Sequence, residues 1–324
     1  MFEYVKKKWY TNLIMKNRNN FPIHNVDLVY TTYTLLLYLL YQSKEEIAST
    51  AFFCGFGLPQ AVIDKLPNSI DCQRYYCGTF NNNPIQYLYF YHQLKQLRRE
   101  FPFLKHSKYY GADHLRYHSA IIGYNKMCVI GDGLGLYYPS KFEEPSLWGK
   151  ILQSIFGIIT KPHGRGKHCD SILYTGMLPL SLPDKKLIKI NPAQLWNEDV
   201  EKQRMILNLF DLNQQDLEMF KGKDIIIFTQ HLELIMSMEN KIKIYQDVIS
   251  QFDNKKIIIK THPLEDTDYG FYFPNVACFT KPLPMELITF MGIIPKIVVT
   301  YNSAAVFNFG DETKKIILDE KFKR

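Results

Sequence analysis

Short apolar runs recur along this chain and alternate with segments of helical character. The runs at 224–228, 256–260 and 296–300 are dominated by isoleucine and valine, which is typical of strands that are buried on both faces of a parallel sheet. Neighbouring parallel strands need a crossover between them, and that crossover is most often a helix. The pattern therefore predicts an α/β protein with parallel sheets.

The alternation occupies both halves of the 324 residues, a length that exceeds what a single core usually serves. A segment rich in lysine and proline, 183–192, separates the halves. We therefore predict two Rossmann-like, doubly wound domains, 1–188 and 189–324, in which ligands bind beyond the carboxyl ends of the strands. Further strands are expected at 27–32, 51–56, 74–77, 126–130, 171–176 and 315–318, and helices at 33–42, 84–100, 193–209, 214–220, 241–252 and 285–291.

The net charge of +7 comes from scattered basic residues without a long lysine or arginine tract. This favours small anionic partners such as nucleotides and argues against nucleic acid. The N-terminus lacks the apolar core of a signal peptide, the longest apolar run (29–41) is too short to cross a bilayer, and six cysteines show no CxxC spacing. We therefore expect a cytoplasmic protein. Lys6-Lys7-Lys8 fits either contact with a membrane surface or a solvated face.

The run at 256–260 ends in Lys260-Thr261-His262-Pro263. The proline biases His262 toward an extended backbone and blocks a helix there, which would hold the imidazole at the mouth of the sheet. A histidine so placed can donate to a phosphate or protonate a leaving group. The alternative is a turn whose histidine only bonds the backbone.

Two later segments carry further polar candidates. Asn302-Ser303-Ala304 opens a predicted helix, whose free N–H groups and dipole would bind an anion with help from the Ser303 hydroxyl; an ordinary N-cap explains the same residues. Pro284 precedes Glu286 at another helix start. Glu286 there either complements the helix dipole or binds ribose hydroxyls.

In the first domain, Gly131-Asp132-Gly133 follows a buried run. The glycines permit a close approach of a ligand. Asp132 is a lone carboxylate that could serve as a general base or orient an acceptor, although a turn aspartate that bonds its own backbone is the alternative.

Metal-binding patterns are weak in this sequence. His114 and His118 have helical i, i+4 spacing, but no glutamate follows His114 and no third ligand is evident. Asp266-Thr267-Asp268 has the spacing of an Asp-x-Asp metal motif but lies in a polar loop, which favours a solvated turn. A basic loop at 161–168 fits a solvated loop better than a phosphate site. These patterns therefore do not predict a metal site.

Taken in order, these segments resemble the motifs of bacterial sialyltransferases of the GT-B type, and most closely those of glycosyltransferase family 52. Asp132-Gly133 resembles the end of a D/E-D/E-G motif, and His262-Pro263 resembles the HP motif. Pro284–Glu286 and Asn302–Ala304 resemble the family's segments around the nucleotide. Thr31 and Thr32 lie at the strand–helix junction of a unit that resembles the family's first βα unit.

The resemblance implies a GT-B fold, with two Rossmann-like domains that face a central cleft. It implies inverting transfer of sialic acid from CMP-sialic acid to a galactose-terminated glycan of lipooligosaccharide or capsule, without a metal cofactor. The implied donor-binding residues are Lys260, Thr261, Pro263, Pro284, Glu286, Asn302, Ser303, Ala304, Thr229 and Gln230, and the implied acceptor-binding residues are Gly133, Thr31 and Thr32.

Two departures from the family pattern affect the catalytic assignment. Gly131 replaces the first acidic residue of the first motif, and Ala304 replaces the second hydroxyl residue of the Ser-Ser/Thr motif. His262 remains the expected acid. The base stays open between Asp132 and two carboxylates of the second domain, Glu233 and Glu239.

Other functions remain compatible with the sequence. A GT-B transferase that uses UDP-glucose or UDP-N-acetylglucosamine would have the same fold. A non-catalytic nucleotide- or carbohydrate-binding homologue would explain Gly131 and Ala304. The expected partners are a nucleotide sugar and a glycan or glycolipid acceptor. A peripheral position on the inner face of a bacterial inner membrane and a homodimer are left open.

Overall fold

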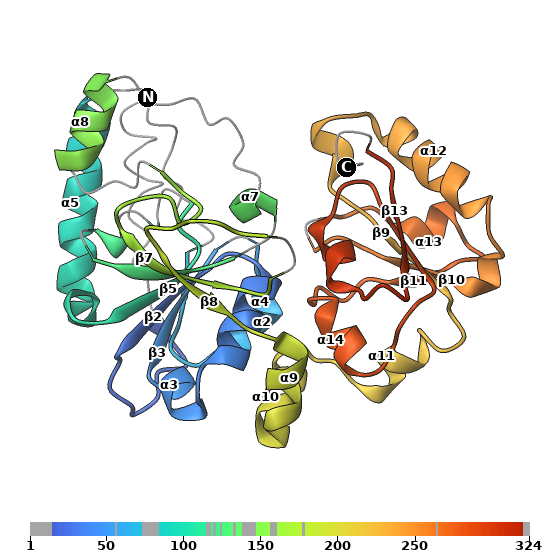
Figure 1. Cartoon of the computed structure of the whole chain (residues 1–324), viewed down its shortest axis with the longest axis horizontal. Coiled ribbons are helices and arrows are strands. Elements are labelled where there is room, and N and C mark those ends of the chain that lie inside the picture. Colours follow the sequence, from blue (N-terminus) through green and yellow to red (C-terminus); the bar gives the residue numbers. More distant parts are fainter. Residues whose placement is uncertain are drawn as a thin grey trace. The chain divides into compact units, whose positions relative to one another are not determined.

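The computed structural model describes residues 15–55, 57–72, 84–114, 118, 121–123, 125–131, 134–137, 147–155, 161–176, 179–263 and 265–319. The chain divides into two compact units, Met1–Ile206 and Leu207–Arg324. Each unit contains its own sheet flanked by helices, as Figure 1 shows. This confirms the predicted α/β class. Within the described ranges, no helix combines the length and apolar character that crossing a bilayer requires.

The second unit is built on a parallel sheet of five strands in the order β11-β10-β9-β12-β13. Its strands are β9 (Ile225–Phe228), β10 (Ile257–Lys260), β11 (Ala277–Phe279), β12 (Ile297–Thr300) and β13 (Lys314–Ile317). Its helices are α11 (Gln214–Glu218), α12 (Met238–Ile249), α13 (Tyr269–Tyr272) and α14 (Glu286–Phe290), with 3-10 turns η2 (Leu232–Leu234), η3 (Asn254–Lys256) and η4 (Ala304–Asn308). The strand order reverses between β9 and β12, so a ligand crevice is expected at their carboxyl ends.

Helix α12 shows how this unit packs. Ser237 caps its first turn, accepting a hydrogen bond from the backbone N–H of Asn240 at 3.3 Å. The buried positions of α12 recur at helical spacing, and they are Lys241, Tyr245, Val248 and Ile249. The stripe that faces the sheet therefore includes one lysine, which must find anionic partners inside the protein.

The first unit is built on an eight-stranded sheet in the order β1-β4-β3-β2-β5-β6-β7-β8, parallel except for β1 at one edge. Its strands are β1 (Met15–Lys16), β2 (Asn25–Val29), β3 (Thr50–Cys54), β4 (Ser69–Asp71), β5 (Lys108–Gly111), β6 (Met127–Ile130), β7 (Cys169–Tyr174) and β8 (Lys186–Lys189). Its helices are α2 (Thr32–Tyr41), α3 (Lys44–Ala48), α4 (Gln60–Lys65), α5 (Pro84–Glu100), η1 (Pro102–Lys105), α7 (Leu134–Tyr137), α8 (Leu147–Ile155) and α9 (Pro192–Glu198); α10 (Val200–Leu209) spans the division. The order reverses between β2 and β5.

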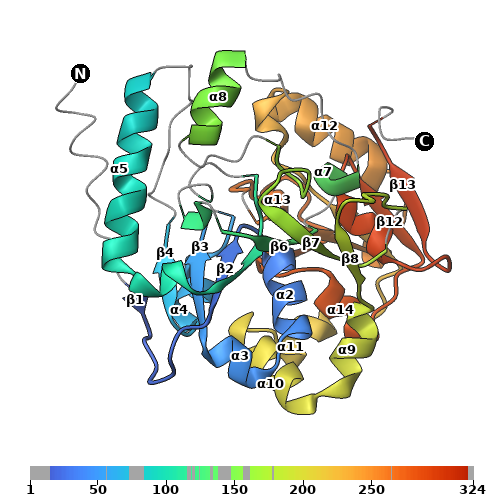
Figure 2. The ribbon, with the colours of Figure 1, turned by 60° about the vertical axis from the view of Figure 1, so that its left-hand side comes forward.

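Helices α2 and α5 cover opposite faces of the first sheet (Figure 2). Successive side chains of a strand point to opposite faces, and the ring contacts follow that rule. Tyr38 of α2 packs against Phe52 with ring centroids 5.8 Å apart, whereas the next residue, Phe53, meets Phe101 beyond the end of α5, also at 5.8 Å. Both helices were predicted from the sequence and are confirmed.

The segment predicted to connect the domains is instead part of the first unit. Residues 183–192 include β8, which extends the first sheet. Helix α9 then packs on α2, and Lys202 donates from Nζ to the carbonyl of Leu40 at 3.1 Å. The chain therefore divides after Ile206 and not after residue 188.

Other elements also differ from prediction. The single helix predicted at 193–209 is two helices, because Asp199 adopts an extended backbone and its carboxylate accepts from the N–H of Lys202 at 2.9 Å. Five strands were not predicted, namely β1, β4, β5, β8 and β11. The strand predicted at 74–77 lies outside the described residues.

Candidate active site

The carboxyl end of β10 places the Lys260–Pro263 turn at the mouth of the second sheet. The N–H of Thr261 donates to the carbonyl of Phe279 at 3.1 Å, so the chain stays extended one residue beyond the strand. The N–H of Glu265 then donates to the carbonyl of His262 at 3.1 Å and closes a turn. The half-buried His262 therefore lies where the sequence predicted it.

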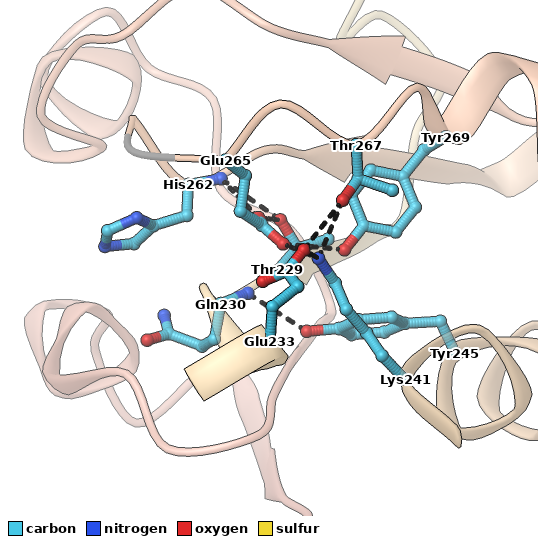
Figure 3. A network of polar contacts seen from close by, with 9 residues as sticks. All are labelled: Thr229, Gln230, Glu233, Lys241, Tyr245, His262, Glu265, Thr267 and Tyr269. Atoms are coloured by element: carbon cyan, nitrogen blue, oxygen red, sulfur yellow. Dashed lines mark hydrogen bonds and ion pairs between the residues drawn. The ribbon is translucent and has the colours of Figure 1, made fainter. Parts of the chain in front are cut away.

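The backbone of His262 is held by two side chains from different elements. Its N–H lies 3.1 Å from Thr229 Oγ1 and 3.1 Å from Glu265 Oε2. Thr229, directly after β9, also donates from Oγ1 to Glu265 Oε2. These contacts fasten the carboxyl ends of β9 and β10 to each other and fix the course of the chain at His262 (Figure 3).

A buried lysine lies beneath this turn. The side chain of Lys241 is fully buried, and its Nζ pairs with Glu265 Oε1 at 2.5 Å and with Glu233 Oε1. Nζ also donates to Thr267 Oγ1 at 2.8 Å, and Thr267 Oγ1 donates to Glu233 Oε1 at 3.0 Å. The buried ammonium therefore has two carboxylates as partners, and a buried ion requires such pairing.

Two tyrosines complete the arrangement. Tyr269 donates from its hydroxyl to Glu265 Oε1 at 2.8 Å, and the hydroxyl of Tyr245 accepts from the N–H of Gln230 at 3.0 Å. Burial raises the pKa of both tyrosines far above its ordinary value, so both are neutral. We call the whole set the His262 network; it comprises Thr229, Gln230, Glu233, Lys241, Tyr245, His262, Glu265, Thr267 and Tyr269 (Figure 3).

The imidazole of His262 projects away from the buried part of the His262 network, toward the same side as the amide of Gln230 (Figure 3). Burial lowers the pKa of His262, and the carboxylate of Glu265 opposes that effect without reversing it. The ring can therefore donate from a neutral N–H at pH 7. A bound phosphate nearby would raise the pKa and favour the protonated, acidic form.

The other residues of the turn differ in exposure. Lys260 is 3 % exposed, and its Nζ donates to the carbonyl of Thr261 at 2.6 Å. Burial lowers the pKa of Lys260 to about 8, against the opposing effect of the Glu265 carboxylate, so the side chain is mainly charged at pH 7. Thr261 is also buried, whereas Pro263 is exposed. Lys260 thus supplies a buried positive charge directly below the turn.

Glu286 begins the short helix α14 and is 6 % exposed. Asn308 donates from Nδ2 to Glu286 Oε1. Burial raises the pKa of Glu286 to about 7, so this carboxyl titrates near neutral pH. Pro284, predicted with it, is also buried.

The segment after β12 corrects one prediction. No α-helix opens at Ser303; instead the five-residue 3-10 turn η4 begins at Ala304 and ends before Gly310. A turn this short has little dipole, so an anion there depends on side chains. Ser303 Oγ accepts from the N–H of Ala305 at 3.2 Å and keeps its own hydrogen available for donation. Asn302 beside it is half-buried.

Of the three candidate bases, Glu233 and Glu239 differ in their structural surroundings. Glu233 belongs to the His262 network, and its Oε2 is buried without a hydrogen-bond partner among the described residues. Burial raises the pKa of Glu233, but hydrogen bonds from Lys241 and Thr267 outweigh that effect and the pKa lies below its ordinary value. Glu239 is exposed on the first turn of α12. Asp132, with Gly133, lies outside the described residues.

In the first unit, Thr31 and Thr32 follow β2 where the strand order reverses. Thr31 Oγ1 accepts from the N–H of Thr34 at 3.1 Å and caps α2, and Thr32 is buried. Both therefore have structural roles at this edge. A Cβ added to Gly131 would lie 2.8 Å from Leu136 Cδ2, the end of a flexible side chain that can shift, so steric crowding does not account for the glycine.

The two sequence patterns that were weighed and disfavoured as metal sites are part of other arrangements. Asp268 caps α13 by accepting from the N–H of Phe271 at 3.3 Å, and Asp266 is exposed. His118 is fully buried, and that burial lowers its pKa well below the ordinary value. His114 lies instead beside a histidine from a distant loop, a pairing that the i, i+4 spacing did not indicate.

Sequence reasoning missed Glu265 and Lys241, which organise the turn at His262. A local signal existed for Glu265, because it follows His262 by three residues and can close the turn. The signal for Lys241 was a lysine at an apolar position of an amphipathic helix.

Solved structures share this architecture. The chain is similar to the α/β-galactoside α-2,3-sialyltransferase of the luminous marine bacterium Photobacterium phosphoreum, with 12% identity, a TM-score of 0.54, and coverage of 91% of this chain and 90% of that one. The GT-B domain of a sialyltransferase from Photobacterium damselae gives 13% identity and a TM-score of 0.54 over 91% and 90% of the two chains. The fold is therefore GT-B, as the motifs implied.

The sequence model of glycosyltransferase family 52 matches residues 79–319. The chain belongs to that family. It is also 30% identical over 209 residues to an uncharacterized protein of Haemophilus influenzae, a match that covers 63% of this chain and 65% of that protein.

Proposed function

We propose that this chain transfers sialic acid from CMP-sialic acid to a galactose-terminated glycan of lipooligosaccharide or capsule, with inversion at the anomeric carbon. The observation that carries the proposal is the position of His262 at the carboxyl end of β10, with its backbone fixed by Thr229 and Glu265. Membership of family 52 and a fold shared with sialyltransferases support it.

The donor would lie along the carboxyl ends of β9, β10 and β12, where the strand order of the second unit reverses. The buried charge of Lys260 favours an anion at this edge. The hydroxyl of Ser303 and the amide of Asn302 would donate to the phosphate. Glu286, whose pKa is raised to about 7 by burial, would accept from ribose hydroxyls in its ionised form.

In the reaction, the bond between the anomeric carbon and the phosphate oxygen of CMP breaks, and a bond from that carbon to the acceptor hydroxyl oxygen forms. Positive charge builds on the sugar in an oxocarbenium-like transition state. His262 would donate its proton to the departing phosphate, and a carboxylate would take the proton of the acceptor hydroxyl. Glu233, Glu239 and Asp132 are the carboxylates to be tested for that role. These groups perform the transfer without a metal ion.

The decisive experiment is incubation of the full chain with CMP-sialic acid and a panel of galactosides, with the product linkage read by NMR. A sialylated galactoside supports the proposal, and its loss in His262→Ala but not in His106→Ala assigns the role of His262. His106 is an exposed histidine of the first unit and serves as a matched control. No product from any galactoside, with CMP-sialic acid intact, would refute the proposed activity.

Two competing functions predict different results in assays of nucleotide binding and of donor hydrolysis. A transferase of UDP-glucose or UDP-N-acetylglucosamine would be stabilised against heat by UDP and not by CMP, because a ligand bound only by the native state raises apparent stability. A non-catalytic homologue would bind a nucleotide but would not hydrolyse CMP-sialic acid in the absence of an acceptor.

A glycolipid acceptor would bring the protein to the inner face of the bacterial inner membrane as a peripheral protein. Sedimentation with vesicles of anionic lipid measures that contact. Sedimentation velocity of the free chain measures whether it forms a homodimer.

A further inference from the structure

A cluster of histidine and aspartate side chains lies at the edge of the first sheet where the strand order reverses. Gly111 ends β5 with a φ of +107°, and a Cβ there would lie 2.5 Å from the carbonyl oxygen of Leu28, so only glycine permits this close turn. The turn carries Asp113 and His114 away from the strand. Tyr30, which follows β2, packs edge-on against the His114 ring with centroids 4.9 Å apart.

A distant loop is tied to this turn through Asp113. Its carboxylate is 2 % exposed and accepts from the backbone N–H groups of His163 at 2.7 Å and Gly164 at 2.9 Å. Oδ2 also lies 2.9 Å from Nε2 of His168. The segment 161–168, which precedes β7, is therefore anchored beside the end of β5.

This anchoring brings two imidazoles together. The rings of His114 and His163 have centroids 5.1 Å apart, with planes inclined by 16°. One ring nitrogen from each and one carboxylate oxygen of Asp113 all lie within 4.8 Å of one another. Both histidines are half-buried, so solvent reaches the cluster while Asp113 stays protected.

We propose that Asp113, His114 and His163 bind one divalent transition-metal ion. Two imidazoles and one carboxylate form a donor set that zinc and iron(II) sites use, whereas Mg²⁺ and Ca²⁺ prefer oxygen ligands alone. The carboxylate is already oriented by two backbone donors and by His168, as the ligands of metal sites usually are.

Binding requires the three ligand atoms, which lie within 4.8 Å of one another, to move closer together. Ligand atoms held at about 2.0–2.1 Å from a tetrahedral ion lie roughly 3.3 Å apart, so the half-buried rings of His114 and His163 have to rotate or shift when the ion binds. The ion then joins the end of β5 to the loop 161–168. Its expected effect is on the stability of the first unit, because it would link two segments of that unit.

Cobalt(II) is the probe for this site, because its visible absorption reports both binding and coordination. Untagged full-length protein, stripped with EDTA, is titrated with Co²⁺, and Zn²⁺ is then added as competitor. We expect one equivalent of Co²⁺ to bind with visible bands that Zn²⁺ abolishes. His114→Ala and His163→Ala should each weaken binding more than about tenfold, whereas His106→Ala should leave it unchanged. Asp113 is not substituted, because it also holds the loop.

Absence of Co²⁺ binding would overturn the proposal, and so would equal affinity in His114→Ala and His106→Ala. Binding of Mg²⁺ as tight as that of Co²⁺ would also overturn it. If both histidine variants lose their fold by circular dichroism, X-ray absorption of the Zn²⁺-loaded wild-type protein decides the matter. Two imidazole ligands are expected there, and a spectrum without imidazole refutes the site.

Discussion

The ammonium group of Lys241 and the carboxylate of Glu265 form an ion pair of 2.5 Å, and neither side chain is exposed to solvent. A buried ion pair of this kind adds little folding stability compared with a well-packed apolar pair. Removal of one partner, however, leaves a buried charge uncompensated and destabilises the protein. The pair has a positional consequence, because the second oxygen of Glu265 accepts from the N–H of His262. The carboxylate of Glu265 therefore both stabilises the second unit, by pairing with Lys241, and positions the proposed acid, His262.

The first prediction concerns this pair. Glu265→Gln should destabilise the protein by about 3–5 kcal/mol, because it removes one of the anions that compensate Lys241. Lys241→Met should also destabilise it, since Glu265 and Glu233 then lose their shared cation. The double variant should lose less than the sum of the two, as expected for contacting residues. Urea unfolding measures all three, and strict additivity would show that the pair is not coupled.

The second prediction concerns His262. His262→Ala should lower kcat for sialyl transfer by about 10²–10⁴-fold, the usual contribution of acid–base catalysis. The variant should stay folded, because Thr229 and Glu265 hold the backbone N–H and not the imidazole. Turnover and thermal unfolding are compared with those of His106→Ala. Wild-type turnover in His262→Ala would remove this residue from the mechanism.

The third prediction separates the candidate bases. Glu233→Gln, Glu239→Gln and Asp132→Asn keep the side-chain shapes but remove the carboxylates, so loss of the base should reduce kcat about 10²–10⁴-fold in one of them. Asp247 is also exposed on α12 and is not a candidate base, so Asp247→Asn controls for a general effect of charge on the second unit. If all three variants retain full rate, none of the three residues is the base.

The sequence predicted the strand before His262 because its signal is local: a run of isoleucine that ends at His-Pro. It did not reveal Lys241 as a buried cation, since a lysine in a helix is ordinarily solvated and its partner Glu265 lies in a loop beyond β10. Strand β5, with the sequence Lys-Tyr-Tyr-Gly, lacks the aliphatic run that identified its neighbours. The cluster of His114 and His163 depends on a loop that returns across the sheet, and no sequence spacing encodes that approach.

The fourth prediction follows from Glu286. Burial raises the pKa of this carboxyl from 4.5 to about 7 in the folded protein, so the folded state holds a proton that the unfolded state releases at lower pH. Stability should therefore fall as pH rises from about 4.5 to 7, by on the order of 3 kcal/mol, and then level off. Glu286→Gln keeps an oxygen that accepts from Asn308 and should abolish this component. Urea unfolding at several pH values measures it, with Glu239→Gln as the exposed control; an unchanged pH profile in Glu286→Gln would contradict the assignment.

The fifth prediction concerns the removal of divalent ions, which should affect the thermal stability of the protein but not the rate of sialyl transfer. The proposed transfer uses His262 and a carboxylate and needs no metal ion. EDTA should therefore leave the rate of sialyl transfer within about twofold of its value in buffer. If a metal ion stabilised the transition state, its removal would raise the barrier by several kcal/mol. The ion proposed at Asp113 should nevertheless raise the thermal midpoint of the wild-type protein when Zn²⁺ is restored, because a ligand bound only by the native state stabilises it. His114→Ala should lose that shift. Abolition of transfer by EDTA, with recovery on Mg²⁺ or Mn²⁺, would instead bring Asp266 and Asp268 forward as metal ligands.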